Sequence, residues 1–122
     1  MVFVSGHAEE DGAPFRGWLV GHFASGPRHS QDVEVRWAVH GLHELRPSWG
    51  LNRQATTLSL LVRGRMRYFF EPSSETVLSR PGDYVLWGPN VAHRWRAELA
   101  DTIVLTVRWP SRAGDAVDVD AP

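Results

Sequence analysis

The side chains of this sequence that could carry acid–base or metal chemistry are mainly its six histidines. Histidine titrates near neutral pH and is a common metal ligand, so it can act in either way. The chain has no Cys, and all 13 of its basic residues are Arg rather than Lys. The sequence therefore excludes thiolate nucleophiles, cysteine metal ligands, disulfides and lysine Schiff bases.

His93 ends the stretch GDYVLWGPNVAH, residues 82–93. This stretch predicts a short apolar strand, a tight turn over residues 88–90, and a second strand that begins at His93. Asn90 suits that turn, because Asn tolerates left-handed backbone geometry better than most residues other than glycine. Alternation along the second strand places His93 and Trp95 on the same side.

Short β-type segments separated by turn signals fill the interior of the chain, and no window shows a helical apolar stripe. The expected strands are residues 17–24, 33–40, 56–64, 65–71, 75–80, 83–87, 93–98 and 102–109. In residues 33–40, apolar side chains alternate with a face that holds Arg36 and His40, so one face is wet or lines a polar cavity. The sequence predicts an all-β jelly roll or barrel with little helix.

From Val33 to Trp109, the order of these signals resembles the cupin superfamily, whose fold is a double-stranded β-helix barrel with a small-molecule site in its mouth. The sharper part of the resemblance is the second cupin motif. Gly82 is followed by five residues and then by Gly88 to His93, which stand where the family has a Pro-x-Gly-x-x-His turn. The Asn that the family has four residues after the His is Ala97 here.

The first cupin motif, which supplies two His and one Glu to a metal ion, is degenerate in this chain. Residues 45–66 contain no His, Asp, Glu or Cys. Counted back from Gly64, the resemblance puts the Glu of the family at Thr57, its second His at Arg53 or Asn52, and its first at Leu51 or Gly50. A catalytic transition metal typically needs three protein ligands, so we expect no metal cofactor.

An alternative is a rebuilt site for Fe, Zn, Mn or Ni, made by His22, His40 and His93, with His43 as a further candidate. The protein would then be a cupin-type enzyme: an isomerase, lyase, cyclase or dioxygenase. In a metal-free form of this hypothesis, His93 is the catalytic acid or base, and His40 is the second catalytic candidate.

The main prediction is instead a metal-free cavity that binds a small organic ligand, with an anion as the leading candidate. Arg53 puts a planar guanidinium where the family has an imidazole, and Arg36 shares a face with His40, so either could bind a carboxylate or phosphate. Trp49 or Trp95 could stack on a ring of the same ligand. The other expected lining residues are Thr57, Ser59 and Tyr68.

The expected organisation is a flexible segment over residues 1–15, a barrel domain over 16–110, and an acidic disordered tail over 111–122. A formal net charge of −1 gives no case for nucleic acid or an anionic membrane as a partner, and no segment has the length of a membrane span. Without a secretion signal, the prediction is a cytoplasmic protein. The resemblance implies a homodimer, and a barrel that serves only as a dimer-forming scaffold is a third hypothesis.

Overall fold

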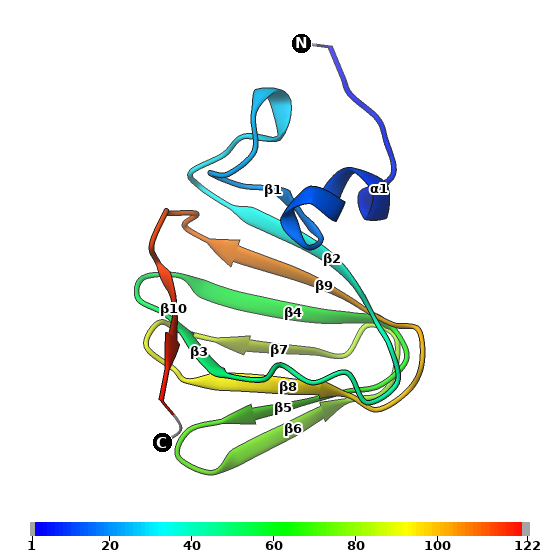
Figure 1. The fold of residues 1–122 in the computed structure, drawn as a ribbon, viewed down its shortest axis with the longest axis vertical. Coiled ribbons are helices and arrows are strands. Elements are labelled where there is room, and N and C mark those ends of the chain that lie inside the picture. The colour runs from blue at the N-terminus through cyan, green and yellow to red at the C-terminus, as the bar shows by residue number, and fades with distance from the viewer. Residues whose placement is uncertain (1, 121–122) are drawn as a thin grey trace.

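The alternating segments form two antiparallel sheets of five strands each, which face one another as a barrel (Figure 1). The computed structural model describes residues 2–120. One sheet has the order β1 (Trp18–Val20), β2 (Glu34–His40), β9 (Thr102–Trp109), β4 (Thr56–Arg63) and β7 (Tyr84–Trp87). The other has the order β10 (Ala116–Val119), β3 (Trp49–Asn52), β8 (His93–Ala97), β5 (Met66–Phe70) and β6 (Ser74–Leu78). The predicted all-β fold is confirmed.

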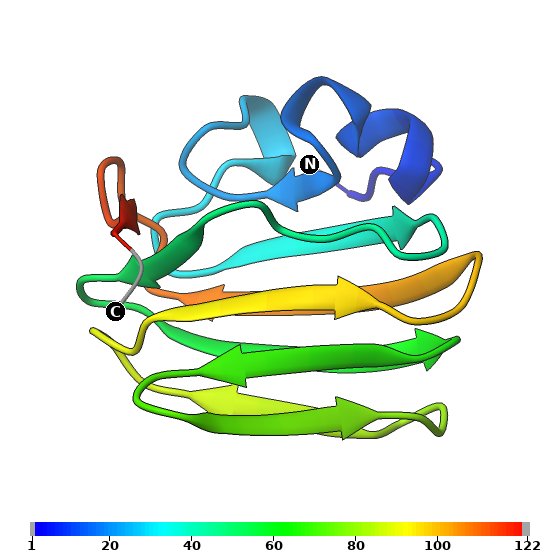
Figure 2. The same cartoon turned by 60° about the horizontal axis from the view of Figure 1, so that its bottom comes forward.

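Helix is limited to short segments near the N-terminus. These are α1 (Ala8–Gly12) and the 3-10 turns η1 (Ala13–Phe15) and η2 (Gly26–Arg28). Figure 2 shows this part of the chain gathered at the β1 end of the barrel. Within residues 2–120, no helix is long and apolar enough to cross a membrane.

The face of β2 that looks polar in the sequence is the inner one. Glu34, Ala38 and His40 are buried, whereas Val39 on the opposite face is 39% exposed. β2 pairs with β9 along its whole length, and β9 pairs with β4. This register sets Arg36 beside Thr106 and Thr106 beside Ser59. The predicted polar cavity face therefore lies inside the barrel.

An apolar cluster lies between the two sheets, and some of its members also line the cavity described below. The buried cluster consists of Leu61, Met66, Tyr68, Leu78, Trp87, Ala97 and Val104. These residues come from strands of both sheets, so the cluster holds the sheets together. Burying such side chains is the main favourable term in folding, with each large one contributing about 1.5–3 kcal/mol.

The turn before His93 has the expected geometry. Asn90 has a φ of 62°, in the left-handed region. Its N–H donates to the carbonyl oxygen of Asn52 at 2.7 Å, which connects the turn to the end of β3. The backbone thus fixes the position at which the strand carrying His93 begins.

The two ends of the chain differ from the sequence expectation. β10 lies in residues 111–120, where a disordered tail is predicted, and it pairs with β3 from Ala116↔Asn52 to Val119↔Trp49. The N-terminal segment contains α1 and η1, and α1 packs against β1 and β2. Residues 1, 121 and 122 lie outside the described residues. Both ends gain order from tertiary contacts, which local composition does not reveal.

Candidate functional site

A cavity of about 660 Å³ lies between the two sheets, in the size range of small-molecule sites. Its walls combine aromatic rings, guanidinium groups, imidazoles and hydroxyls. The lining residues used below are Arg16, Trp18, Arg36, His40, Glu44, Arg46, Ser59, Tyr68, Trp87, His93, Trp95, Thr106, Arg108 and Asp118. The predicted alternation of β8 is confirmed, since His93 and Trp95 both line the cavity.

His93 is held as a neutral imidazole. Its Nδ1 lies 3.1 Å from the carbonyl oxygen of Val91. Because a carbonyl oxygen only accepts, Nδ1 carries the proton and Nε2 is an acceptor. Burial, and then the nearby positive charges of Arg108 and Arg46, lower the pKa of His93 to about 4. At neutral pH this site therefore offers an acceptor atom from His93, not a cation.

His40 is buried at the end of β2, with 4% of its surface exposed. Its Nδ1 donates to the carboxylate of Glu44, and its ring lies 4.4 Å from that of Trp95, centroid to centroid. Burial lowers the pKa of His40, although the hydrogen bond to Glu44 opposes the shift. Glu44 and Trp95 thus fix the orientation of this imidazole in the cavity wall.

Positive groups outnumber negative ones around the cavity. Among residues 2–120, four arginines line it, against the carboxylates of Glu44 and Asp118. Arg46 pairs with Asp118 at 3.0 Å, and Arg108 lies 3.4 Å from Glu34. Within the described residues, neither Arg16 nor Arg36 forms an ion pair with a carboxylate. The cavity wall therefore carries positive charge that the described residues do not neutralise.

Arg36 shows this excess charge most clearly. Its Nε donates to the carbonyl oxygen of Arg16 at 2.8 Å. Burial, and then repulsion from Arg108 and Arg16, lower the pKa of Arg36. The indole of Trp18 lies near both guanidinium carbons, 4.7 Å from that of Arg108 and 6.0 Å from that of Arg36. An anion in the cavity would relieve the repulsion between these groups.

Hydroxyl groups form a second part of the wall. Ser59 Oγ lies 3.2 Å from Thr106 Oγ1, and the Ser59 side chain also hydrogen-bonds to Tyr68. Burial raises the pKa of Tyr68 to about 12, so its hydroxyl stays protonated at neutral pH. Trp87 adds a buried indole N–H that finds no acceptor among residues 2–120. A bound molecule with several acceptor oxygens suits this set of donors.

The structure does not bring together the residues expected for a rebuilt metal site. No group of three or more His, Cys, Asp or Glu within residues 2–120 is placed to hold a metal ion. His40 and His93 line the main cavity, whereas His22 lines a second pocket and His43 is exposed in a loop. These donors do not fit a transition-metal centre, which needs its ligands to converge on one point.

Guanidinium groups lie beside Gly50 and Thr57, two positions that the sequence analysis compares with the cupin ligands. The Arg46 guanidinium covers Gly50, and any Cβ at Gly50 would clash with it. Gly50 in turn pairs with His93 across β3 and β8. At the position of the family's Glu, Thr57 is fully buried, and its hydroxyl accepts a hydrogen bond from Arg108 Nε at 3.4 Å. Two arginines, Arg46 and Arg108, thus lie near His93.

Three of the expected ligand-binding residues lie away from the cavity lining. Arg53 is exposed at the end of β3, and its backbone N–H donates to the carbonyl oxygen of Asp115. Trp49 packs instead under the guanidinium of Arg94, at 5.8 Å. Thr57 points inward but touches Arg108, as described above. Arg53 lies outside because the adjacent Asn52 takes the inward position of the alternating strand.

The arginines that do face the cavity were missed in the sequence, except for Arg36. Arg108 had a usable signal, because Thr102, Val104, Thr106 and Arg108 share one face of β9. Arg46 and Arg16 had none, since they lie in segments between strands and reach the cavity only through the fold. Trp18 likewise becomes a lining residue only when β1 pairs with β2.

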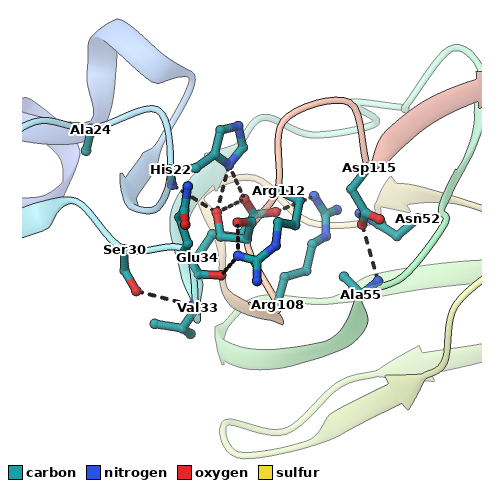
Figure 3. Close-up of polar contacts among 12 residues, drawn as sticks. His22, Ala24, Ser30, Val33, Glu34, Asn52, Ala55, Arg108, Arg112 and Asp115 are labelled. Carbon is teal, nitrogen blue, oxygen red and sulfur yellow. Dashed lines mark hydrogen bonds and ion pairs between the residues drawn. The ribbon is translucent and has the colours of Figure 1, made fainter.

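A second pocket of about 420 Å³ lies beside the first and shares Arg16, Trp18, Arg108 and Ala116 with it. Figure 3 shows His22, Glu34 and Arg108 together there. Ser111 Oγ donates to Glu34 Oε2 at 2.9 Å and lies 2.8 Å from His22 Nδ1. Ser111 is fully buried, and its oxygen also accepts the backbone N–H of His22. This cluster positions Glu34 against Arg108 and does not provide an accessible nucleophile.

No protein-family model and no curated protein matches the chain, but solved structures do. A double-stranded β-helix protein from Klebsiella pneumoniae has a TM-score of 0.70 at 15% identity, over 87% of this chain and 84% of its own. A cupin superfamily protein from Desulfitobacterium hafniense has a TM-score of 0.57 at 15% identity, over 71% of its own chain and 70% of this one. The sugar 3,4-ketoisomerase QdtA from Thermoanaerobacterium thermosaccharolyticum, solved with TDP, has a TM-score of 0.61 at 11% identity, over 68% of this chain and 64% of its own. The chain has the double-stranded β-helix fold of the cupins.

Proposed function

We propose that the main cavity binds a small organic anion, a carboxylate or a phosphate, without a transition metal. The observation that carries this proposal is the pair of arginines beside His93, Arg46 over Gly50 and Arg108 at Thr57. Guanidinium groups supply fixed positive charge, as a divalent cation would, and their planar N–H donors match carboxylate and phosphate oxygens.

Arg36 adds a cation that no carboxylate within the described residues neutralises. The uncharged parts of the ligand would meet Trp95, Tyr68 and the neutral Nε2 of His93, which accepts a hydrogen bond from a ligand hydroxyl. Among the structural neighbours, QdtA was solved with TDP, a charged phosphate ligand. The TDP complex supports the proposal only by analogy of fold, because a sequence identity of 11% does not assign a ligand to this chain.

Arginine replacement provides the test. Tryptophan fluorescence or calorimetry would measure the binding of small carboxylates, sugar acids and sugar phosphates, with neutral sugars for comparison. We expect at least one anion to bind and added salt to weaken it. Arg36→Gln should raise its Kd at least tenfold with only a small loss of stability, because Arg36 has no ion pair to break within the described residues and gives up one hydrogen bond to the carbonyl oxygen of Arg16.

Arg53→Gln is the matched control, because Arg53 is exposed and lies outside the cavity lining. It should leave the Kd unchanged. The proposal fails if neutral sugars bind as well as anions, if no anion binds, or if Arg36→Gln binds an anion as tightly as the parent protein.

A second candidate function is metal-free catalysis with His93 as the base. The open Nε2 of His93 in the cavity favours it. A pKa of about 4 makes this imidazole a weak base at neutral pH, however, so binding remains the first proposal. Proton NMR of a bound anion would decide between them. Turnover or exchange of a ligand proton that is lost in His93→Gln would support catalysis, and an unchanged ligand would contradict it.

Three further parts of the sequence prediction remain proposals for the whole protein. They are a homodimer, a cytoplasmic location and the absence of a nucleic-acid partner. The near-neutral formal charge of −1 supports the last of these, since nucleic-acid binding relies on clustered positive charge at the surface. The arginines of the cavity lie inside the barrel and offer no such surface.

A further inference from the structure

The second pocket is built mainly by the N-terminal and C-terminal segments of the chain. Its volume of about 420 Å³ is in the size range of small-molecule sites. Apart from Glu34 and Arg108, its lining residues lie outside Val33–Trp109, the part of the chain that resembles the cupins. They are Pro14, Phe15, Arg16, Trp18, His22, Phe23, Arg112, Gly114 and Ala116. The cupin resemblance therefore assigns no role to this pocket.

Aromatic rings gather around Phe23 in the second pocket. The centroid of the Phe23 ring lies 5.0 Å from that of Phe15, 5.4 Å from that of His22 and 6.4 Å from that of Trp18. The ring planes are inclined to Phe23 by 53° to 83°, an edge-to-face arrangement to which a further ring can add. Phe15 is 37% exposed, so these rings are open to a ligand. We call these four residues the aromatic cluster.

Guanidinium groups complete the wall of the second pocket, which Arg16, Arg108 and Arg112 line. Glu34 is the only carboxylate among its lining residues within residues 2–120. It lies 3.4 Å from Arg108 and accepts a hydrogen bond from the Ser111 hydroxyl, so its charge is already compensated. An aromatic ring bound here would gain both ring–ring and cation–π contacts, whereas an aliphatic group would gain neither.

The second pocket shares one wall with the main cavity. Arg16, Trp18, Arg108 and Ala116 line both. Burial, and then repulsion from Arg108 and Arg16, lower the pKa of Arg36 in the main cavity, so these three guanidinium groups lie near one another. An acid group bound among them would therefore lie next to the aromatic cluster.

We propose that the second pocket binds an aromatic ring of the ligand whose acid group binds in the main cavity. The protein then selects aromatic organic acids, in which a ring is joined to a carboxylate or phosphate directly or by a short linker. The acid group pairs with Arg16, Arg36 and Arg108, and the ring packs against the aromatic cluster. This inference rests on the anion-binding function proposed above and adds the chemical class of the ligand.

Calorimetry with matched pairs of acids tests this selectivity. The pairs are benzoate and cyclohexanecarboxylate, phenylacetate and cyclohexylacetate, and phenyl phosphate and cyclohexyl phosphate. The members of each pair have the same acid group and a similar size, and only one has an aromatic ring. In at least one pair we expect the aromatic acid to bind about fivefold more tightly.

Phe15→Leu removes an exposed ring of the aromatic cluster but keeps an apolar side chain. It should raise the Kd of the aromatic acid about fivefold and leave that of its cyclohexyl partner within about twofold of the parent value. Phe3→Leu is the matched control, because Phe3 is 76% exposed and lies outside both pockets. It should change neither Kd.

The possible failures are distinct. If no anion binds, the anion-binding function fails and this inference fails with it. If sugar acids or sugar phosphates bind but no aromatic acid does, only the inference fails. The same holds if both members of every pair bind equally, or if Phe15→Leu binds the aromatic acid as tightly as the parent protein.

Should Phe15→Leu fail to fold, proton NMR of the parent protein answers the same question. Nuclear Overhauser effects should connect the ligand ring to the rings of Phe15 and Phe23. Their absence contradicts the proposal, and effects that reach only Tyr68 and Trp95 would place the ring in the main cavity instead.

Discussion

The imidazole of His93 lies among cationic side chains because two small residues, Gly50 and Thr57, leave room for guanidinium groups beside it. Gly50 leaves room for the guanidinium of Arg46, and Thr57 accepts a hydrogen bond from Arg108. Both arginines oppose protonation of His93, in addition to the effect of its burial. A residue that titrates near neutral pH in water therefore acts as a permanent acceptor here.

The folded protein should lose stability in acid through His93. The pKa of this group is about 4 in the folded state, below the ordinary value of 6.5 expected in the unfolded chain. The unfolded state thus binds more protons between these values, and the free energy of unfolding falls as pH drops below about 6.5. By pH 4.5 the loss from this group is about 2–3 kcal/mol.

Urea denaturation of the parent and of His93→Gln at pH 7 and pH 4.5 measures this contribution. Carboxylates elsewhere titrate in both proteins, so the difference between their pH dependences isolates the histidine. His93→Gln should lose about 2–3 kcal/mol less than the parent over this interval. Equal losses would mean that His93 is protonated in the folded state near its ordinary pKa.

At the scale of elements, Asp115 attaches the C-terminal strand β10 to the barrel (Figure 3). Its carboxylate is buried and accepts hydrogen bonds from the backbone N–H groups of Gln54 at 2.7 Å and Ala55 at 3.2 Å, and from Asn52 Nδ2 at 3.0 Å. These contacts bind the loop after β3 to the start of β10. They explain why an acidic, small-residue tail is ordered here.

Asp115→Ala should lower the free energy of unfolding by about 2–4 kcal/mol, since it leaves buried donors without an acceptor. Hydrogen exchange should show β10 and β3 opening first, and urea denaturation gives the total effect. Asp118→Ala on the same strand is the control. Asp118 is 71% exposed in its ion pair with Arg46, so its loss should cost less than about 1 kcal/mol. Similar costs for the two variants would contradict the role given to Asp115.

For the whole molecule, the barrel is polar inside at the cavity. Within the part of the chain that the structure describes, His, Asp and Glu side chains do not converge on a point where a metal ion could bind. After incubation with Zn, Ni, Mn or Fe(II) and desalting, we expect far less than one metal ion per chain. Chelators should leave Tm unchanged. Stoichiometric metal that is lost in His93→Ala would contradict the metal-free site.

The parts of the fold that sequence reasoning predicted are those with a strong local signal. Alternation located β2, β4, β5, β8 and β9, and the turn at Asn90 marked the start of β8. β3 and β10 were missed because both have only four residues, and because β10 lies in an acidic segment of small residues whose composition favours disorder. Pairing with strands distant in the sequence stabilises them, and such pairing has no local signature.

The sequence by itself determined the β-strand pattern, the absence of His, Asp, Glu and Cys from residues 45–66, and the pairing of His93 with Trp95 and of Arg36 with His40 on common strand faces. Only the tertiary structure decided that Arg46, Arg108 and Trp18 share the cavity and that Arg53 does not. The physical reason is that the two kinds of feature depend on contacts over different distances along the chain. Strand alternation follows from backbone geometry between neighbouring residues, whereas long side chains meet in a cavity only after strand register and loop paths are fixed.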